Sequence, residues 1–176
     1  MSILKVARMG HPVLRAKARR LEKAEIRSVP IQKLIDDMIE TMHEYHGVGL
    51  AAPQIHEGVR LFVASLDTGE GDEAEVETLA IVNPEITIVG SEVADDWEGC
   101  LSIPDIRGRV PRAREITVRA MDRNGDRIEL HAHDFHARVL QHETDHLDGV
   151  LFIDRMKSYE SLTFLDEYSR FWSKER

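Results

Sequence analysis

The stretch His142-Glu143-Thr144-Asp145-His146 places two histidines four residues apart, with a glutamate directly after the first. On an α-helix, residues i and i+4 lie on one face with their Cβ atoms about 5–6 Å apart. Both imidazoles can therefore reach one cation, and the glutamate beside them is free to transfer protons. The spacing predicts a helix that carries part of a hydrolytic metal site, with the rest of the fold arranged around it.

A metal site of this kind needs a third protein ligand and one position open to water. Phe152 occupies the downstream position that a third histidine would fill, and it cannot bind a metal. Glu160 or Glu167 could serve from a later helix, although neither lies in a recognisable motif. Upstream, Cys100 is the only cysteine of the chain and cannot form a disulfide within it. Because two histidines lack a partner, metal ligation by Cys100 is favoured over its use as a small buried side chain.

A third segment, GVGLAAPQ at residues 47–54, alternates glycines with small and apolar residues. Another chain can approach such backbone closely, and Gln54 adds an amide donor at its end. A helix end followed by a tight loop is the alternative interpretation. It is partly right, because the preceding amphipathic helix has to stop at Gly47.

These segments, GVGLAAPQ (47–54), EGCLS (98–102) and QHETDHLDG (141–149), resemble in this order the three motifs of peptide deformylases. The similarity runs from residues 10–15 to residues 149–154 and covers most of the chain. The resemblance implies removal of the formyl group from the N-terminal formyl-methionine of nascent polypeptides, with release of formate. It implies N-formylmethionyl peptides as substrates and leaves open a contact with the ribosome near the exit tunnel.

The family motifs can be carried over residue by residue. The resemblance implies three metal ligands: Cys100, His142 and His146. Glu143 would act as the general base that deprotonates bound water, and then as the acid that protonates the departing amine. The side-chain amide of Gln54 and the backbone N–H of Leu101 would hold the formyl oxygen as it becomes an oxyanion.

Two neutral imidazoles and one thiolate leave a divalent cation with a formal charge of plus one. Such a cation lowers the pKa of bound water from about 15.7 toward 7, and the resulting hydroxide would attack the formyl carbon. A thiolate ligand suits Fe(2+), and the resemblance implies iron as the native metal, with Ni(2+), Co(2+) or Zn(2+) able to substitute. Oxidation of the iron or of the thiol would then inactivate the enzyme.

Four residues are candidates for substrate binding. The resemblance implies that Gly49 offers its backbone to an extended peptide. Val48, Phe135 and Val139 are candidates for lining an apolar pocket that takes the methionine side chain. Phe135 and Val139 are four residues apart and share a helix face. Core packing is an equally good interpretation of these two side chains.

Two residues stand where the family usually has glycine: His56 and Asp134. Aspartate is a good N-cap and fits a helix that begins at Phe135. The change at His56 makes the conformation of its loop harder to predict. The remaining histidines near the motifs are expected to be solvated or hydrogen-bonded and not to be ligands: His43, His46, His131, His133 and His136.

Composition indicates one globular domain over residues 1–176, because 42% of the residues are hydrophobic and 31% are charged. The net charge of −9, from 23 basic and 32 acidic residues, argues against a DNA partner. A basic run, Arg15, Lys17, Arg19 and Arg20, could still dock on ribosomal RNA, although a solvated loop is the simpler interpretation. The sequence shows no apolar leader and no membrane-spanning stretch, so we expect a cytoplasmic protein without membrane contact.

The fold class expected is α+β, with mainly antiparallel strands around a central helix that carries HExxH. An N-terminal amphipathic helix is predicted from Pro30 to about His46, and a C-terminal helix over residues 158–172. A loop rich in glycine and acidic residues is predicted over residues 67–78. The predicted strands span residues 61–66, 79–84, 86–89, 116–122 and 127–131. Asn124-Gly125 joins the last two strands as a hairpin.

Two other functions remain open at this stage. A zinc endopeptidase would cleave N-blocked internal peptides without releasing formate. A deformylase-like binding protein without activity is disfavoured by the intact Glu143.

Overall fold

The computed structural model describes residues 2–68 and 75–173. Its α-helices are α1 (Lys23–Ile26), α2 (Val29–Glu44), α3 (Asp134–Leu147), α4 (Phe152–Arg155) and α5 (Leu165–Phe171). Its strands are β1 (Gly49–Ala51), β2 (Leu61–Thr68), β3 (Glu75–Cys100), β4 (Ile103–Met121), β5 (Arg127–His133) and β6 (Thr163–Phe164). Short 3-10 helices are η1 (Pro12–Arg15), η2 (Ala52–Ile55) and η4 (Tyr159–Ser161).

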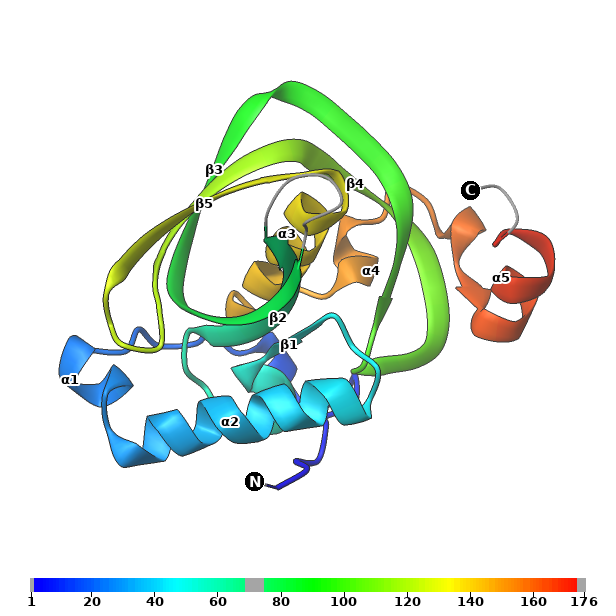
Figure 1. Ribbon diagram of the computed structural model, residues 1–176. Helices are drawn as coiled ribbons and strands as arrows, with labels where there is room; N and C mark the ends of the chain where they lie inside the picture. The colour runs from blue at the N-terminus through cyan, green and yellow to red at the C-terminus, as the bar shows by residue number, and fades with distance from the viewer. Residues whose placement is uncertain (1, 69–74, 174–176) are drawn as a thin grey trace.

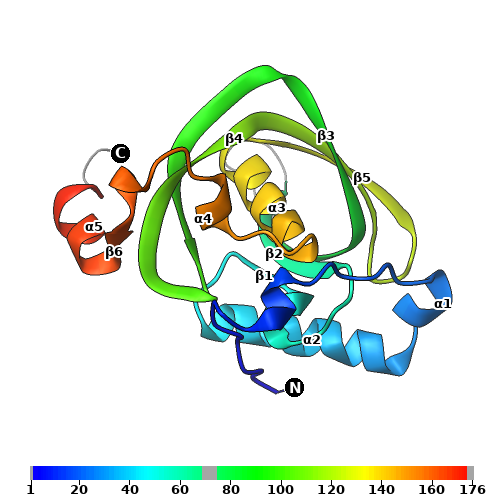
Figure 2. The same cartoon turned by 180° about the vertical axis from the view of Figure 1, so that it is seen from behind.

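The strands form one antiparallel sheet in the order β1-β2-β3-β4-β5, and β6 pairs with β4. The long strands β3 and β4 curve, and α3 lies within their curve when the molecule is seen from the front and from behind (Figures 1 and 2). The predicted mixture of helices and mainly antiparallel strands is confirmed. None of the helices among the described residues is long and apolar enough to cross a membrane.

The predicted amphipathic helix is α2. Its apolar face buries Ile35, Met38 and Met42, which pack in one cluster with residues of β1 and β2. The helix ends at Glu44, earlier than the predicted stop at Gly47, because His46 already adopts a left-handed backbone conformation with φ 54°. The backbone N–H of Gly47 then donates to Met42 O at 2.9 Å and closes the helix.

Two of the predicted strands, 79–84 and 86–89, are parts of the single strand β3. Its pairing with β4 shifts register between Val82 and Glu85, where Pro84 cannot donate to the ladder. The predicted loop over residues 67–78 was too long, because β2 continues to Thr68 and β3 starts at Glu75. Residues 69–74 of that loop lie outside the described residues.

The predicted hairpin is confirmed. β4 and β5 pair from Met121 opposite Arg127 onward, and Gly125 in the turn has φ +73°. The carboxylate of Asp122 accepts backbone N–H groups from Asn124 and Asp126, both at 2.8 Å, which fixes the turn. β4 begins at Ile103, well before the predicted start, because its first half pairs with the second half of β3.

The prediction of one C-terminal helix over residues 158–172 was wrong. The segment forms η4, then β6, and only then the short helix α5. The reason is a pairing that the local pattern does not contain: Phe164 lies opposite Ile106 and Thr163 opposite Arg107. A strand at this point prevents the helix from starting before Leu165.

Both positions at which the resemblance leads us to expect glycine have left-handed backbone. His56 has φ 70° and Asp134 has φ 49°. Glycine adopts this conformation without the steric cost that a Cβ brings. The prediction that Asp134 caps α3 was wrong, because the N-cap position is His133 and the carboxylate of Asp134 instead pairs with Arg114 at 2.6 Å.

We predict that His56→Gly stabilises the protein. The left-handed conformation costs a residue with a Cβ about 1–2 kcal/mol, and glycine avoids this cost. Glycine also loses more backbone entropy on folding, so the net gain in unfolding free energy should be about 0.5–1 kcal/mol. For a chain of this size, each 1 kcal/mol shifts Tm by about 2–4 °C. Thermal unfolding followed by circular dichroism measures the shift.

His56→Ala is the matched control. It removes the edge contact between the rings of His56 and His11, whose centroids lie 4.7 Å apart, but it keeps a Cβ at the strained position. This variant should show no gain. A Tm for His56→Gly at or below that of His56→Ala would contradict the explanation.

Candidate metal centre

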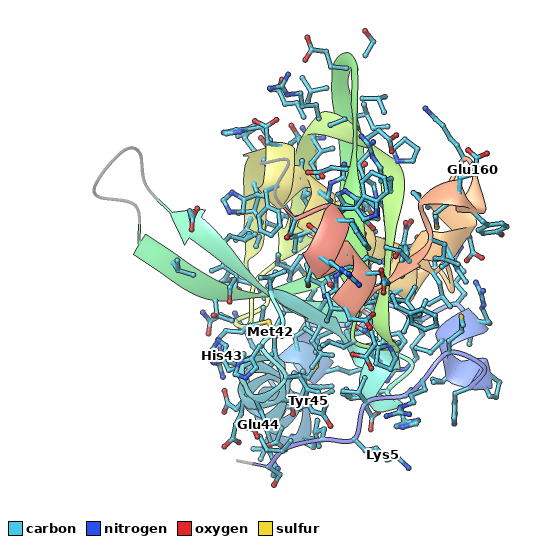
Figure 3. All side chains as sticks on the ribbon, turned by 90° about the vertical axis from the view of Figure 1, so that its right-hand side faces the viewer. Lys5, Met42, His43, Glu44, Tyr45 and Glu160 are labelled. Atoms are coloured by element: carbon cyan, nitrogen blue, oxygen red, sulfur yellow. The ribbon has the colours of Figure 1, made fainter. Side chains whose placement is uncertain are left out.

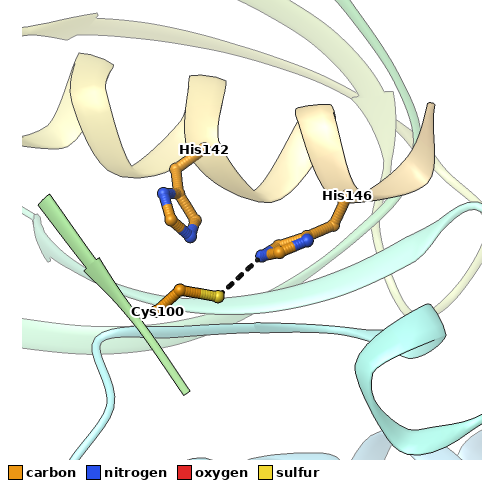
Figure 4. Close-up of side chains that lie close together, drawn as sticks. All are labelled: Cys100, His142 and His146. Carbon is orange, nitrogen blue, oxygen red and sulfur yellow. Dashed lines mark hydrogen bonds between the residues drawn. The ribbon is translucent and has the colours of Figure 1, made fainter. Parts of the chain in front are cut away.

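Three side chains from two elements meet at the end of β3. Cys100 is the last residue of that strand, and His142 and His146 lie one turn apart on α3. One ligand atom from each lies within 4.8 Å of the others, and Cys100 Sγ is 3.3 Å from His146 Nε2. Figure 4 shows the thiol and both rings turned toward one another. The structure therefore brings together the three residues for which metal ligation was predicted.

The alternative third ligands are not at this site. Glu160 and Glu167 are exposed, and Figure 3 shows Glu160 at the edge of the molecule. In residues 2–68 and 75–173, the thiol and the two rings are the one cluster with metal-ligand spacing. The histidines that were predicted not to be ligands lie outside that cluster. One of them, His131, instead contacts Thr117 Oγ1 at 3.2 Å.

Glu98 orients the first imidazole of the motif. Its Oε2 accepts a hydrogen bond from His142 Nδ1 at 2.9 Å, which leaves the Nε2 side of the ring for a cation. The same carboxylate accepts from Arg112 Nε at 2.9 Å and from a terminal nitrogen of Arg138 at 2.8 Å. All four side chains are buried. The sequence analysis did not single out Glu98, although its place in EGCLS, two residues before Cys100, was the available signal.

The network continues through the motif itself. Arg112 also donates to Asp145 at 2.5 Å, and Asp145 accepts a further bond from Arg155 at 2.7 Å. Asp145 precedes His146 directly, so this pairing fixes the last turn of α3 against β4. Both histidine-bearing turns of the helix are thus attached to the same buried arginine, Arg112.

Electrostatics favour the ionised forms of the carboxylate and the thiol. Burial alone would raise the pKa of Glu98, but hydrogen bonds from His142 and Arg112 outweigh it and hold the pKa far below its usual range. Burial also opposes ionisation of Cys100, yet the adjacent His146 and His142 lower the pKa of its thiol well below the ordinary value. A thiolate is the form that binds a metal.

Glu143 lies beside the cluster in a buried position. Burial raises the pKa of its carboxyl group, against the lowering effect of His142 and His146. Its Oε2 is buried without a hydrogen-bond partner among the described residues. The side chain also lies so close to Gly49 that a Cβ on that glycine would overlap the carboxylate. This contact explains why β1 begins with a glycine.

Gln54 presents its amide nitrogen to the cluster. The backbone N–H of Ala51 donates to Gln54 Oε1 at 2.8 Å, so the NH₂ group points the other way. Its Nε2 lies 3.5 Å from Cys100 Sγ and 3.2 Å from Ser102 Oγ. The donor of this amide therefore faces the thiol of Cys100 and the hydroxyl of Ser102.

A cleft of about 820 Å³ opens onto these residues. Seven of its lining residues were predicted to take part in catalysis or substrate binding: Val48, Gly49, Gln54, Leu101, Phe135, Val139 and Glu143. Val48 and Phe135 are 45% and 50% exposed, whereas Val139 is buried. The cleft is also lined by Trp97 and Leu165, which the sequence analysis did not assign to a site.

Comparisons of this chain with a family model, with curated proteins and with solved structures all point to one family. The sequence model of the polypeptide deformylase family matches residues 3–161. "Peptide deformylase 2" of a Nostoc species is 44% identical over 174 residues, which are 98% of this chain and 96% of the relative. A class I type b peptide deformylase from Acinetobacter baumannii, solved with Met-Ala-Ser bound, is 38% identical with a TM-score of 0.80 and covers 89% of this chain and 100% of its own. Peptide deformylase from Thermotoga maritima is 39% identical with a TM-score of 0.79, covering 90% and 100%.

We predict that Glu98→Gln strongly destabilises the fold. The change keeps the size of the side chain but leaves Arg112 and Arg138 buried with less negative charge, which costs about 3–5 kcal/mol of unfolding free energy. Urea denaturation of the metal-free protein measures the loss. Glu129→Gln, which removes a carboxylate from an exposed ion pair with Arg119, is the control and should leave stability unchanged.

The effect should depend on pH in a defined direction. The folded protein holds the pKa of Glu98 below that of the unfolded chain, which is about 4.3. The ionised carboxylate of Glu98 therefore contributes fully to folding stability above about pH 4.3. This contribution is lost as the pH falls through the pKa that Glu98 has in the folded protein. The stability difference between wild type and Glu98→Gln should shrink below about pH 4. A difference that stays constant in acid would contradict this account.

Proposed function

The chain belongs to the polypeptide deformylase family, and we propose that it removes the formyl group from the N-terminal formyl-methionine of nascent polypeptides, releasing formate. The observation that carries the proposal is the meeting of Cys100, His142 and His146, of which Cys100 and His142 line a cleft of about 820 Å³. The family is metal-dependent, and these residues give this chain a candidate site for the metal.

The donor set fits a divalent transition metal. Two imidazole nitrogens and a sulfur lie within 4.8 Å of one another, and the 3.3 Å between Cys100 Sγ and His146 Nε2 suits two bonds of about 2.0–2.3 Å to a common centre. We propose Cys100, His142 and His146 as the ligands and Fe(2+) as the native metal, with Ni(2+), Co(2+) or Zn(2+) able to substitute. When bound, the metal acts as a Lewis acid that polarises water and the formyl oxygen.

Glu143 moves the proton in this proposal. Its buried Oε2 has no partner among the described residues, so it can accept a proton from the attacking water. Burial raises the pKa of the group, which allows it to keep that proton until the amine nitrogen departs. Glu143 then protonates the amine and returns to the carboxylate form.

Gln54 and Leu101 stabilise the developing negative charge. The NH₂ group of Gln54 is held toward Cys100 by the hydrogen bond that its carbonyl accepts from Ala51. Leu101 follows Cys100 in the turn between β3 and β4, so its backbone N–H lies next to the thiol ligand. Preorganised donors of this type stabilise an oxyanion without reorganisation during the reaction.

The substrate binds along β1 and the first turns of α3. β1 stands at one end of the strand order, so the backbone of Gly49 has an edge to offer an extended peptide. Val48, Phe135 and Val139 line the same cleft and form the pocket for the methionine side chain. In this proposal α3 is the central helix of the fold, because it supplies two ligands, Glu143 and part of that pocket.

We propose that one catalytic domain spans residues 1–176. We also propose that the protein works in the cytoplasm, because a free thiol stays reduced there. It would meet its substrates near the ribosomal exit tunnel. The basic run adds little to the ribosome contact, because Arg15, Arg19 and Arg20 are paired with Asp154, Glu25 and Glu85.

The direct test is formate release from formyl-Met-Ala-Ser by protein purified without oxygen, with metal analysis of the same sample. We expect formate in step with metal content, loss of activity after chelation, and its return with Ni(2+) or Co(2+). Purification in air should lower the activity, because the iron and the thiolate are both open to oxidation. Cleavage of N-blocked internal peptides without formate would instead indicate an endopeptidase.

We predict that Glu143→Gln lowers kcat for formate release by about 10²–10⁴-fold, because general acid–base catalysis is lost. Metal content should not change, since the three ligands remain. Glu40→Gln is a matched control, because Glu40 also has a buried carboxylate oxygen without a described partner but belongs to α2. Unchanged turnover in Glu143→Gln would revive the interpretation as an inactive binding protein.

A further inference from the structure

Arg138 lies on α3 one turn before His142 and carries a buried positive charge to the metal centre. Its side chain is among the buried ones, at 6% exposure, so the guanidinium needs partners inside the protein. One partner is the carboxylate of Glu98, whose Oε1 lies 2.8 Å from Arg138 Nη1. The sequence analysis gave Arg138 no role, because nothing local shows that its charge reaches β3.

Backbone carbonyls hold this guanidinium in place. Its Nη1 donates to Val110 O at 2.7 Å and lies 3.3 Å from Asp96 O, and its Nη2 donates to Ala94 O at 2.8 Å. These carbonyls belong to β3 and β4, so two strands fix the orientation of one side chain of α3. Arg138 is therefore held against Glu98, and its donors are already in use on the side of the cleft.

The two oxygens of Glu98 have different partners. Oε1 accepts from Arg138 at 2.8 Å and from Arg112 Nε at 2.9 Å. Oε2 accepts from Arg112 Nη2 at 3.0 Å and from His142 Nδ1 at 2.9 Å. Arg138 thus draws the negative charge of the carboxylate toward the oxygen that His142 does not use.

The charge of Arg112 is divided between two carboxylates. Besides Glu98 it pairs with Asp145, at 2.5 Å from Nη1 to Oδ2. It compensates Glu98 only in part, and Arg138 supplies further positive charge to that carboxylate. Removing Arg138 would leave Glu98 in place, because both contacts with Arg112 remain, but would leave it less neutralised.

The degree of neutralisation matters for the ring of His142. A carboxylate that keeps more of its negative charge pulls harder on the Nδ1 proton, and the imidazole then becomes a stronger electron donor through Nε2. A stronger donor would make a bound cation less electrophilic, and bound water less acidic. The charge next to Oε1 therefore bears on the chemistry at the opposite end of the hydrogen-bond chain.

We propose that Arg138 is a positioning residue for the metal centre, which acts through Glu98 and limits the donor strength of His142. The proposal rests on the metal site proposed above. Arg138 does not touch the substrate in this account, so its loss should lower kcat and leave KM unchanged.

The first test observes the Nδ1 proton of His142 by nuclear magnetic resonance. Arg138→Met removes the charge and keeps most of the bulk of the side chain. The proton signal should move downfield, because the hydrogen bond to Glu98 becomes stronger. The comparison is made on metal-free protein and on protein loaded with Zn(2+), so the readout does not depend on turnover.

The second test uses formate release from formyl-Met-Ala-Ser. Arg138→Met should lower kcat by about 10–100-fold, the usual range for losing a group that supports a metal ligand. Arg138→Lys keeps a positive charge, but its single nitrogen lacks the fork that reaches both strands. It should restore most of the proton signal and of kcat, while its thermal stability stays below that of wild type.

Arg60→Met is the matched control for a merely structural effect. The side chain of Arg60 is 12% exposed and is also attached to the end of α3, with contacts to Leu147 O at 3.4 Å and Asp148 Oδ1 at 2.6 Å. Glu98 is not among its described partners. Arg60→Met should lose stability without moving the proton signal of His142.

Three results would overturn the proposal. The first is an unmoved proton signal in Arg138→Met, or in Arg138→Gln if the methionine variant does not fold. The second is a higher KM with unchanged kcat, which would indicate direct contact with the substrate. The third is an equal loss of kcat in Arg138→Lys and Arg138→Met, which would indicate a structural role alone. If wild type released no formate, the proposed function would fail, but the proton signal would still test the action of Arg138 on His142.

Discussion

The buried carboxylate of Glu98 is the group on which the rest of the site depends. It joins His142 on α3 to Arg112 and Arg138, so a strand and a helix that are distant in sequence share one ionised centre. Residues 98 and 100 of a strand point to the same face, which means that the strand that holds Glu98 against α3 also delivers the thiol of Cys100 there. Buried charges are tolerated when they are paired and hydrogen-bonded, and here each partner also has a geometric task.

Two glycines make room for this arrangement. A Cβ on Gly49 would overlap the carboxylate of Glu143, so the base can approach β1 only where a side chain is missing. Gly99 points away from the face of Glu98 and Cys100, and there the guanidinium of Arg107 lies over its backbone. Gly49 and Gly99 therefore reflect close approach by charged side chains. Backbone flexibility is not needed to explain them.

How much could be predicted from sequence follows from the range of each interaction. The spacing of His142 and His146 is local, so helix and ligand pair could be predicted from five residues. Cys100 was favoured as the third ligand, but its approach depends on the contacts of Glu98, which no local pattern contains. The same holds for β6: its pairing partners at residues 106 and 107 are distant in sequence, and the predicted helix over 158–172 failed there. The sequence hinted at left-handed backbone at His56 and Asp134 only because similar proteins usually have glycine at these two positions.

The described contacts also separate what the metal contributes from what the fold contributes. In small zinc domains the ion supplies the folding free energy, because nothing else holds the ligands together. Here Glu98 fixes the ring of His142, the salt bridges of Asp145 fix the turn that carries His146, and the hairpin of β3 and β4 fixes Cys100. The imidazoles already lower the pKa of the thiol. In the proposed site a cation would therefore meet three candidate ligands that protein contacts have already oriented, and its binding energy would not be needed to build the site.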